Sequence, residues 1–218
     1  MILYGSSLSP YVRKVLAFAG EKGIELELKP TGSAPGQPSD EFLAASPARK
    51  MPALRDGDFT LADSSAIIHY LEAVHPEPNL IPTEPQARGR TIWFDEYSDT
   101  VLTSCGAKMF FNRIVLPRFF GKQGDEEAAA SAERDELPRV LDYLETVVPA
   151  AGEFLVEGRI TLADIAIASP FANLGHMGCA RDAERHARVF AYVDSILARP
   201  SFASWIDREN TLLARQAA

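Results

Sequence analysis

The sequence predicts a two-part fold, an α/β domain over residues 1–78 followed by an all-α domain over residues 84–218. Two observations lead to this prediction. In the first 80 residues, short apolar or alternating segments lie on both sides of helical patterns, whereas almost every later segment repeats its apolar residues with the period of a helix. Between the two parts, residues 75–82 contain three prolines, which interrupt any helix.

The first part begins as a βαβ unit. Ile2–Tyr4 is a short apolar strand, and a helix follows with Ser9 at its N-cap and Pro10 at its first position, an arrangement that helices favour. Gly23 ends this helix, whose apolar residues recur at i, i+3, i+4 and i+7. Residues 24–28 then alternate in polarity with period two, as a half-buried strand does.

Two further strands and two helices complete this part. Residues 30–38 are rich in Gly, Pro and Ser and are predicted to form a loop, after which Ser39 opens a short helix. Asp56 and Gly57 provide the positive φ that a hairpin turn needs. With a last helix over residues 64–75, the order is βαβ, α, ββα, which is that of a thioredoxin-like domain.

Helical patterns account for nearly all of the second part. One long helix is predicted over residues 85–111 and another over about 126–148, with a break expected at Pro117. A further helix starts at Thr161. Asp164 follows three residues later, which is the spacing of a capping box. Pro200 separates the last two amphipathic helices.

Composition excludes several classes of protein. The formal net charge is −8 and neither half is basic, which argues against nucleic-acid binding through phosphate neutralisation. Cys105 and Cys179 have no metal-ligand spacing, so we expect two reduced thiols and no metal. No run of about 20 apolar residues could span a membrane, and the N-terminus lacks a signal-peptide pattern. We therefore expect a cytoplasmic protein without a membrane partner.

Residues 51–65 predict a site for a small charged peptide. Met51 precedes a proline, so its backbone is extended and its N–H and C=O stay available for strand-like pairing. About ten residues later, Asp63 and Ser64 begin a helix, and a helix N-terminus offers free N–H groups and a partial positive charge that suit a carboxylate. A pairing backbone beside an anion-binding helix end can hold a charged peptide.

Three segments together resemble the glutathione S-transferase family: LYGSSLSPYVRKV at residues 3–15, SPARKMPAL at 46–54 and LADSSAIIHYL at 61–71. The resemblance extends along essentially the whole chain. It implies that glutathione is the co-substrate, that the first domain binds it, and that the second substrate lies against the helical domain. It also implies a homodimer and a cis bond between Met51 and Pro52.

In this resemblance, Ser9 is the catalytic residue. Its oxygen lies at a helix start that favours anions, and a hydrogen bond from its hydroxyl to the glutathione sulfur would stabilise thiolate over thiol. The same hydroxyl could act only as an N-cap. Ser6 is the alternative, because some members use the first residue of this loop. The loop contains no cysteine, which argues against thiol-transferase chemistry.

The resemblance also assigns the glutathione contacts. Met51 pairs with the cysteinyl backbone, Asp63 meets the γ-glutamyl ammonium, Ser64 meets its carboxylate, and Lys50 reaches the glycine carboxylate. Many members have Glu where this chain has Asp63, so the shorter side chain changes the angle of that contact. Asp63 and Ser64 could instead only cap the helix, and Lys50 could be a solvated charge.

An apolar wall for the electrophile is expected against the helical domain. Its candidates are aromatic residues, with Lys108 and Arg113 nearby in sequence: Tyr11, Phe110, Phe111, Phe119 and Phe120. Aromatic residues at helical spacing can equally belong to a core, whereas ligand pockets combine an apolar lining with a few polar groups.

The sequence thus predicts a glutathione transferase that joins the glutathione thiolate to an electrophilic, largely apolar small molecule. Two alternatives stay open. The Ser6–Ser9 segment suggests a glutathione-dependent isomerase of the maleylacetoacetate kind, and a non-catalytic member would act by binding another protein. Retention on immobilised glutathione together with turnover of an aromatic halide would separate the enzyme from the binding module.

Overall fold

The computed structural model describes residues 1–31 and 38–216, so residues 32–37 of the predicted 30–38 loop lie outside the described residues. Its N-terminal part contains a four-stranded sheet in the order β2-β1-β3-β4. The strands are β1 (Ile2–Tyr4), β2 (Glu27–Lys29), β3 (Ala53–Asp56) and β4 (Phe59–Ala62). β1 is parallel to β2 and antiparallel to β3, and β4 pairs antiparallel with β3.

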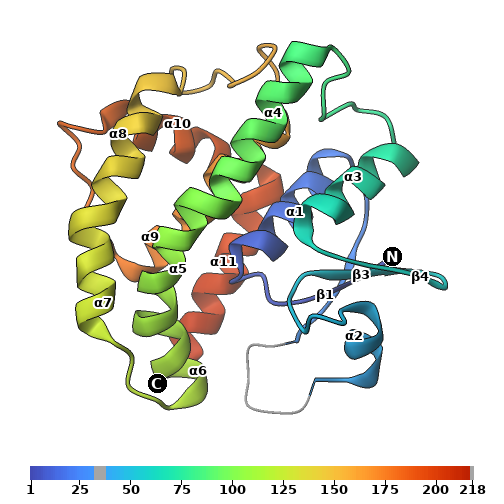
Figure 1. Ribbon diagram of the computed structural model, residues 1–218, viewed down its shortest axis with the longest axis horizontal. Helices are drawn as coiled ribbons and strands as arrows, with labels where there is room; N and C mark the ends of the chain where they lie inside the picture. The colour runs from blue at the N-terminus through green and yellow to red at the C-terminus, as the bar shows by residue number, and fades with distance from the viewer. Residues whose placement is uncertain (32–37, 217–218) are drawn as a thin grey trace.

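Three helices cover the two faces of this sheet. They are α1 (Pro10–Glu21), α2 (Asp40–Ala45) and α3 (Ser64–Val74). Figure 1 shows α1 and α3 on one side of the sheet and α2 on the other. Successive strand residues point to opposite faces, so Leu3 packs in the core that contains α1 and α3, while its neighbour Tyr4 packs with Phe42 of α2. The predicted order of elements is confirmed.

The second strand is shorter than the sequence predicts. Residues 24–28 keep their alternation between half-buried and exposed side chains, but only Glu27–Lys29 pair in the sheet. β1 has three residues, and the ladder between Ile2–Glu27 and Tyr4–Lys29 uses all of them. The hairpin forms as predicted, with Gly57 at φ 57° and Asp56 opposite Phe59.

The C-terminal part is helical, and α4, α5, α7 and α8 lie in front of α9 and α10 in the view of Figure 1. Its first helical run consists of α4 (Pro85–Tyr97), a π-helical segment (Ser98–Leu102), α5 (Thr103–Phe110), a second π-helical segment (Phe111–Val115) and α6 (Leu116–Phe120). Next come α7 (Glu126–Ser131), a third π-helical segment (Ala132–Glu136), α8 (Leu137–Val147), α9 (Leu162–Met177), α10 (Ala187–Leu197) and α11 (Pro200–Arg215).

The break expected at Pro117 is wrong. The helical run continues to Phe120 and ends at Gly121, whose φ of 59° gives a left-handed C-cap. Pro117 lies in the first turn of α6, directly after the second π-helical segment. Val115 and Leu116 keep helical φ and ψ, so the run passes through Pro117 although the proline lacks an N–H.

α9 is the buried centre of the helical part. Every residue from Leu162 to Leu174 is buried, as expected for a helix that is apolar on all sides. Asp164 secures its start: the carboxylate accepts from the Thr161 N–H (2.8 Å) and hydroxyl (3.0 Å) and from the Tyr192 hydroxyl (2.6 Å). α9 packs against α1 of the N-terminal part and so links the two parts. Among the described helices, none is long and apolar enough to cross a membrane.

Candidate active site

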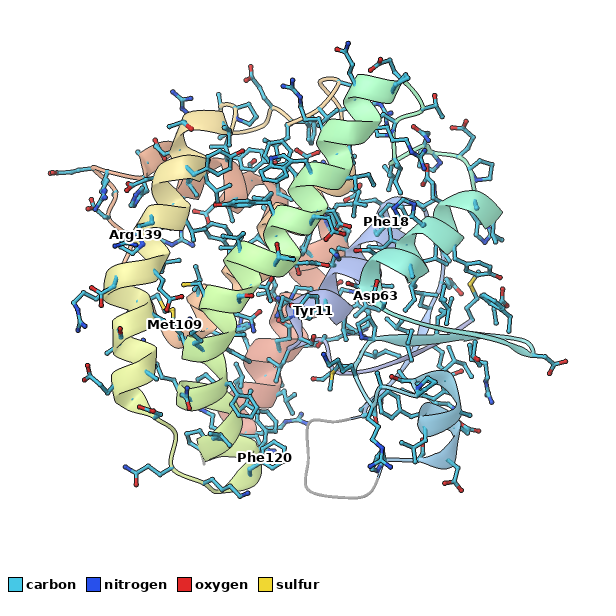
Figure 2. The ribbon with its side chains drawn as sticks, viewed as in Figure 1. Tyr11, Phe18, Asp63, Met109, Phe120 and Arg139 are labelled. Atoms are coloured by element: carbon cyan, nitrogen blue, oxygen red, sulfur yellow. The ribbon has the colours of Figure 1, made fainter. Side chains whose placement is uncertain are left out.

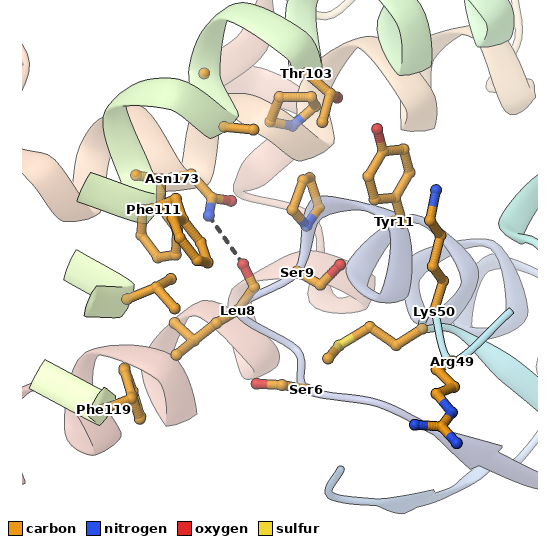
Figure 3. Close-up of a pocket in the computed structure, with 17 residues that line it drawn as sticks. Ser6, Leu8, Ser9, Tyr11, Arg49, Lys50, Thr103, Phe111, Phe119 and Asn173 are labelled. Atoms are coloured by element: carbon orange, nitrogen blue, oxygen red, sulfur yellow. Dashed lines mark hydrogen bonds between the residues drawn. The ribbon is translucent and has the colours of Figure 1, made fainter. Parts of the chain in front are cut away.

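A cavity of about 590 Å³ lies between the two parts of the molecule (Figure 3). The N-terminal part contributes the loop between β1 and α1 and the residues before β3: Ser6, Leu8, Ser9, Pro10, Tyr11, Arg49, Lys50 and Met51. The helical part contributes residues of α5, the second π-helical segment, α6 and α9: Thr103, Gly106, Ala107, Phe110, Phe111, Val115, Phe119, Pro170 and Asn173. One side of the cavity is therefore largely apolar and the other carries the polar and basic groups.

Ser9 occupies the N-cap position of α1 without capping it. Its backbone is extended, with φ −75° and ψ 126°, and its carbonyl accepts from the Arg13 N–H at 2.9 Å. In the described part of the chain, the Ser9 hydroxyl makes no hydrogen bond to the free N–H groups of the helix. The hydroxyl therefore stands at the positive end of α1 and is free to donate to a ligand in the cavity.

Ser6 also lines the cavity, but its side chain is buried and its hydroxyl is oriented differently. The Ser6 carbonyl accepts from the Ser9 N–H at 2.9 Å and so closes the tight turn between the two serines. In Figure 3 the Ser9 hydroxyl points to the side where Tyr11 and Lys50 lie, whereas the Ser6 hydroxyl points to the opposite side.

The corner before β3 is built around Ser46. The buried Ser46 hydroxyl donates to the Lys50 carbonyl (2.7 Å) and accepts from the Lys50 N–H (3.0 Å). Arg49 turns the chain with φ 56°. Lys50 is exposed at the cavity, and the Met51–Pro52 bond is cis, as expected. Among the described residues, none hydrogen-bonds the Met51 N–H or C=O.

Asp63 and Ser64 lie at the start of α3 rather than in the cavity lining. Asp63 has φ 85° and caps the helix, because its carboxylate accepts from the Ala66 N–H at 3.0 Å. Burial is the main reason that the pKa of the Tyr11 hydroxyl is raised, and the negative charges of Asp99 and Asp63 raise it further. The start of α3 therefore lies beside Tyr11, at the edge of the cavity, as Figure 2 shows for Asp63.

A buried lysine neutralises two acids behind this edge. The ammonium of Lys14 donates to Asp95 (2.6 Å), to Asp99 (2.7 Å) and to the Ser65 hydroxyl (3.3 Å). The carboxylate of Asp99 also accepts from the Ser64 hydroxyl at 3.4 Å. Burial raises the pKa of Asp99, although the charge of Lys14 opposes that rise.

Most of the predicted aromatic wall is present. Tyr11, Phe110, Phe111 and Phe119 line the cavity, and the Tyr11 hydroxyl donates to the Asp99 carbonyl at 3.1 Å. Phe111 is 49% exposed, so the cavity stays open beside it.

Three residues suggested by sequence proximity lie outside this wall. Phe120 is half-buried but does not line the cavity. Lys108 pairs with Glu136 at 2.7 Å, and Arg113 pairs with Glu126 and with a second glutamate, Glu133. Lys108 and Arg113 are near the aromatic wall in sequence, but their charges do not enter the cavity. Both side chains point to glutamates on α7 and the third π-helical segment.

Several cavity residues were missed by sequence reasoning. Asn173 and Pro170 of α9 and Thr103 of α5 all line the cavity. The signal for Asn173 was available, because an asparagine in a long apolar helix needs partners for its amide. Thr103 gave no such signal, and its buried hydroxyl oxygen has no hydrogen-bond partner among the described residues.

The two cysteines are free thiols outside the cavity lining, as expected. Burial raises the pKa of Cys105 to about 11 and that of Cys179 to about 12, which makes both poor nucleophiles. In residues 1–31 and 38–216, no group of three His, Cys, Asp or Glu side chains could hold a metal ion.

Family models match both parts of the chain. The model described as glutathione S-transferase, N-terminal domain, matches residues 3–79, and the model for the C-terminal domain matches residues 111–209. The chain belongs to the glutathione S-transferase family. Curated glutathione S-transferases support this membership. The mouse theta-3 protein is 31% identical over 208 residues, which cover 94% of this chain and 80% of that protein. The maize glutathione S-transferase 3 is 31% identical over 209 residues, which cover 92% of this chain and 90% of the maize protein.

Solved glutathione S-transferase structures have the same fold. Human glutathione S-transferase T1-1 in its apo form superposes with a TM-score of 0.81 at 27% identity, covering 97% of this chain and 88% of the human one. A glutathione S-transferase III in apo form gives a TM-score of 0.79 at 28% identity, covering 94% of this chain and 95% of its own. The predicted architecture, a thioredoxin-like domain followed by a helical domain, is thus that of the family.

Proposed function

We propose that this chain is a glutathione transferase that joins the thiolate of glutathione to an electrophilic, largely apolar small molecule. One observation carries the proposal: the Ser9 hydroxyl, which makes no capping bond in the described chain, stands where the polar and apolar sides of the cavity meet. The polar side offers groups that suit a charged tripeptide, and the apolar side offers an aromatic surface for its electrophile.

Glutathione would extend from the start of α3 to the corner before β3. At one end, the Asp63 carboxylate would bind the γ-glutamyl ammonium and the Ser64 hydroxyl and N–H its carboxylate, at the free end of a helix. In the middle, the unpaired N–H and C=O of Met51 would bind the cysteinyl backbone as a strand does. At the other end, Lys50 would meet the glycine carboxylate as an exposed point charge.

Ser9 would lower the pKa of the glutathione thiol. A free thiol has a pKa of about 8.5, so only a small share is thiolate at neutral pH. A hydrogen bond donated by the Ser9 hydroxyl stabilises the charged sulfur, and the partial positive charge at the start of α1 acts in the same direction. The Ser6 hydroxyl points to the other side in Figure 3, which favours Ser9 for this role.

The electrophile would lie against the helical side of the cavity. Among the described residues, those of the helical part that line the cavity include no ionisable side chain. Phe110, Phe111 and Phe119 offer broad apolar faces there. A neutral, largely apolar molecule therefore gains most from this surface. Its reactive carbon would face Ser9 and the sulfur, and the sulfur–carbon bond would form as the leaving group departs.

The test combines binding with the pH dependence of the rate. The chain should be retained on immobilised glutathione and should turn over a generic aromatic halide. Ser9→Ala should lower kcat ten- to a thousandfold, on the order of 1.4–4 kcal/mol, and should raise the thiol pKa of bound glutathione toward its free value. Ser6→Ala should change both much less. Retention without turnover would indicate a binding module, and a larger effect of Ser6→Ala would reverse the serine assignment.

We also propose that two copies of the chain form a homodimer. Phe59 and Val74 of the first domain (the first patch) and Trp93 of α4 (the second patch) are 46%, 46% and 52% exposed, and we place these side chains in the interface between the two copies. The exposed Asp58 lies next to Phe59 in the sequence, in the first patch, and the exposed Arg90 lies near Trp93, in the second patch. The two patches therefore carry opposite charges. Sedimentation should give twice the mass of the chain, and Phe59→Glu should give a monomer; a monomeric parent protein would refute the proposal.

A further inference from the structure

We propose that two residues of α9, Ser169 and Asn173, are positioning residues for Ser9. They hold the backbone carbonyls on the two sides of Ser9 and thereby fix where its hydroxyl stands in the cavity. The inference rests on the proposed role of Ser9 and adds to it a requirement from the helical part of the molecule.

Each neighbour of Ser9 is bound by a side chain of α9. The Asn173 amide donates to the Leu8 carbonyl at 2.9 Å, as the dashed line in Figure 3 shows. The Ser169 hydroxyl donates to the Pro10 carbonyl at 2.7 Å. Both side chains are buried, with exposures of 4% for Asn173 and 1% for Ser169. The loop that carries Ser9 is thus attached to a helix about 160 residues away in the sequence.

A buried arginine fixes the direction of the asparagine. Arg13 donates to the Asn173 side-chain oxygen at 2.8 Å and to the Ser169 carbonyl at 2.7 Å. Arginine has donors only, so the amide oxygen of Asn173 must face it and the amide nitrogen must face the Leu8 carbonyl. The Glu209 carboxylate accepts three hydrogen bonds from Arg13, at 2.8, 3.0 and 3.1 Å, and so holds the guanidinium in turn.

The position of the Ser9 hydroxyl depends on this attachment. In the described chain it has no capping bond of its own, so its place is set by the backbone on both sides of it. Asn173 is also part of the cavity wall, so the residue that holds Leu8 lies within the site. A misplacement of a reacting group by 1 Å can slow a reaction about a hundredfold. Loss of the hydrogen bond to either carbonyl should therefore displace the Ser9 hydroxyl and slow the reaction.

The test compares two serine-to-alanine changes that are alike in their chemistry. Ser169→Ala removes the anchor of Pro10. The matched control, Ser98→Ala, also removes a buried hydroxyl that donates to a carbonyl, because Ser98 bonds the Ala166 carbonyl of the same helix at 2.6 Å. Ser169→Ala should lower kcat about tenfold, raise the thiol pKa of bound glutathione, and leave the KM for glutathione within about twofold. Ser98→Ala should leave kcat and the thiol pKa unchanged.

A double variant separates action through Ser9 from a general effect on structure. In Ser9→Ala/Ser169→Ala, the thiol pKa should equal that of Ser9→Ala alone, because a positioning residue has nothing left to position. Additive shifts, or equal effects of Ser169→Ala and Ser98→Ala, would overturn the inference while leaving the role of Ser9 intact. A thiol pKa that Ser9→Ala itself leaves unchanged would overturn both.

Discussion

Arg13 and Glu209 lie 196 positions apart in the sequence and form an ion pair in which neither side chain is exposed. Arg13 is on α1 and Glu209 on α11, so the pair joins the first domain to the end of the helical domain. The His176 ring lies 2.8 Å from the same carboxylate. Burial alone would raise the pKa of Glu209, but the charge of Arg13 and the hydrogen bonds from His176 and Arg13 lower it below its usual value of 4.5.

Glu209→Gln should destabilise the fold strongly at neutral pH. The change leaves the guanidinium of Arg13 buried without its counter-charge, and breaking a buried ion pair in this way costs about 3–5 kcal/mol. Because the folded pKa of Glu209 is lowered, its contribution is present above pH 4.5 and is lost as the pH falls through the folded value. The difference in the free energy of unfolding from the parent protein should therefore shrink below pH 4.5. Urea unfolding at a series of pH values measures this, and a constant difference would contradict it.

Local patterns were sufficient to predict much of the fold and part of the cavity. The Ser9-Pro10 helix start, the Asp56-Gly57 hairpin and the apolar periods are all local signals, and the structure has these elements. Ser9, Lys50 and the predicted aromatic residues other than Phe120 line the cavity, because the order of elements brings the start of α1 next to β3 and α5.

The polar groups behind the site could not be predicted in this way. A charged residue on an amphipathic helix normally belongs to its solvated face, yet Arg13 and Lys14 are 0% and 1% exposed. Their partners lie 51 to 196 positions away, and no local period links residues so far apart. The expected break at Pro117 was wrong because a proline does not always end a helical pattern, and the residues around Pro117 do not show which outcome holds.

Lys14→Met should also destabilise the fold, and more so at neutral than at acidic pH. The variant leaves Asp95 and Asp99 without the cation that neutralises both, at a cost of about 3–5 kcal/mol. Burial already raises the pKa of Asp99, and loss of Lys14 removes the charge that opposes this rise. The contribution of a carboxyl with a raised pKa is fully present below its usual value of 3.8 and is lost as the pH rises through the folded value. Thermal unfolding between pH 4 and 7 should show this trend.

Lys22→Met is a matched control for Lys14→Met. Lys22 is also a buried lysine of the first domain, bonded to Glu72 at 2.7 Å. Glu72 keeps other donors when Lys22 is removed, including the Asn79 amide (2.7 Å) and the Leu80 N–H (3.1 Å). The loss in the free energy of unfolding should therefore be smaller than for Lys14→Met. If the two variants lost the same free energy of unfolding, leaving Asp95 and Asp99 without Lys14 would cost no more than leaving Glu72 without Lys22.

Thr103→Val should stabilise the protein. The buried Thr103 hydroxyl lacks a partner among the described residues, and an unpaired buried polar group costs about 1–3 kcal/mol. Valine has nearly the same shape, so the free energy of unfolding should rise by about 1 kcal/mol. Thr91→Val should do the same, because the Thr91 hydroxyl on α4 is also unpaired in the described chain but lies outside the cavity lining. Only Thr103→Val should change the KM for the electrophile, and a loss of stability in both variants would indicate that the hydroxyls have partners.

Asp63→Asn should separate the two roles of Asp63, helix cap and partner of an ammonium. Asparagine tolerates the φ of 85° seen at this position and can still accept from the Ala66 N–H, so the melting temperature should stay close to that of the parent protein. It removes the negative charge, and a hydrogen bond to a charged group is worth more than one between neutral groups, so glutathione should bind about tenfold more weakly. The KM for glutathione should rise while kcat changes little, as expected when substrate and transition state lose the same contact.

Asp63→Ala completes this comparison, because it removes both the charge and the cap. It should weaken glutathione binding as much as Asp63→Asn does and should in addition reduce the free energy of unfolding by about 1 kcal/mol, the usual cost of a lost cap. Calorimetric titration with glutathione and thermal unfolding measure the two effects separately. If both variants bound glutathione as the parent protein does, and only Asp63→Ala melted at a lower temperature, Asp63 would be a helix cap alone and the γ-glutamyl ammonium would need another partner.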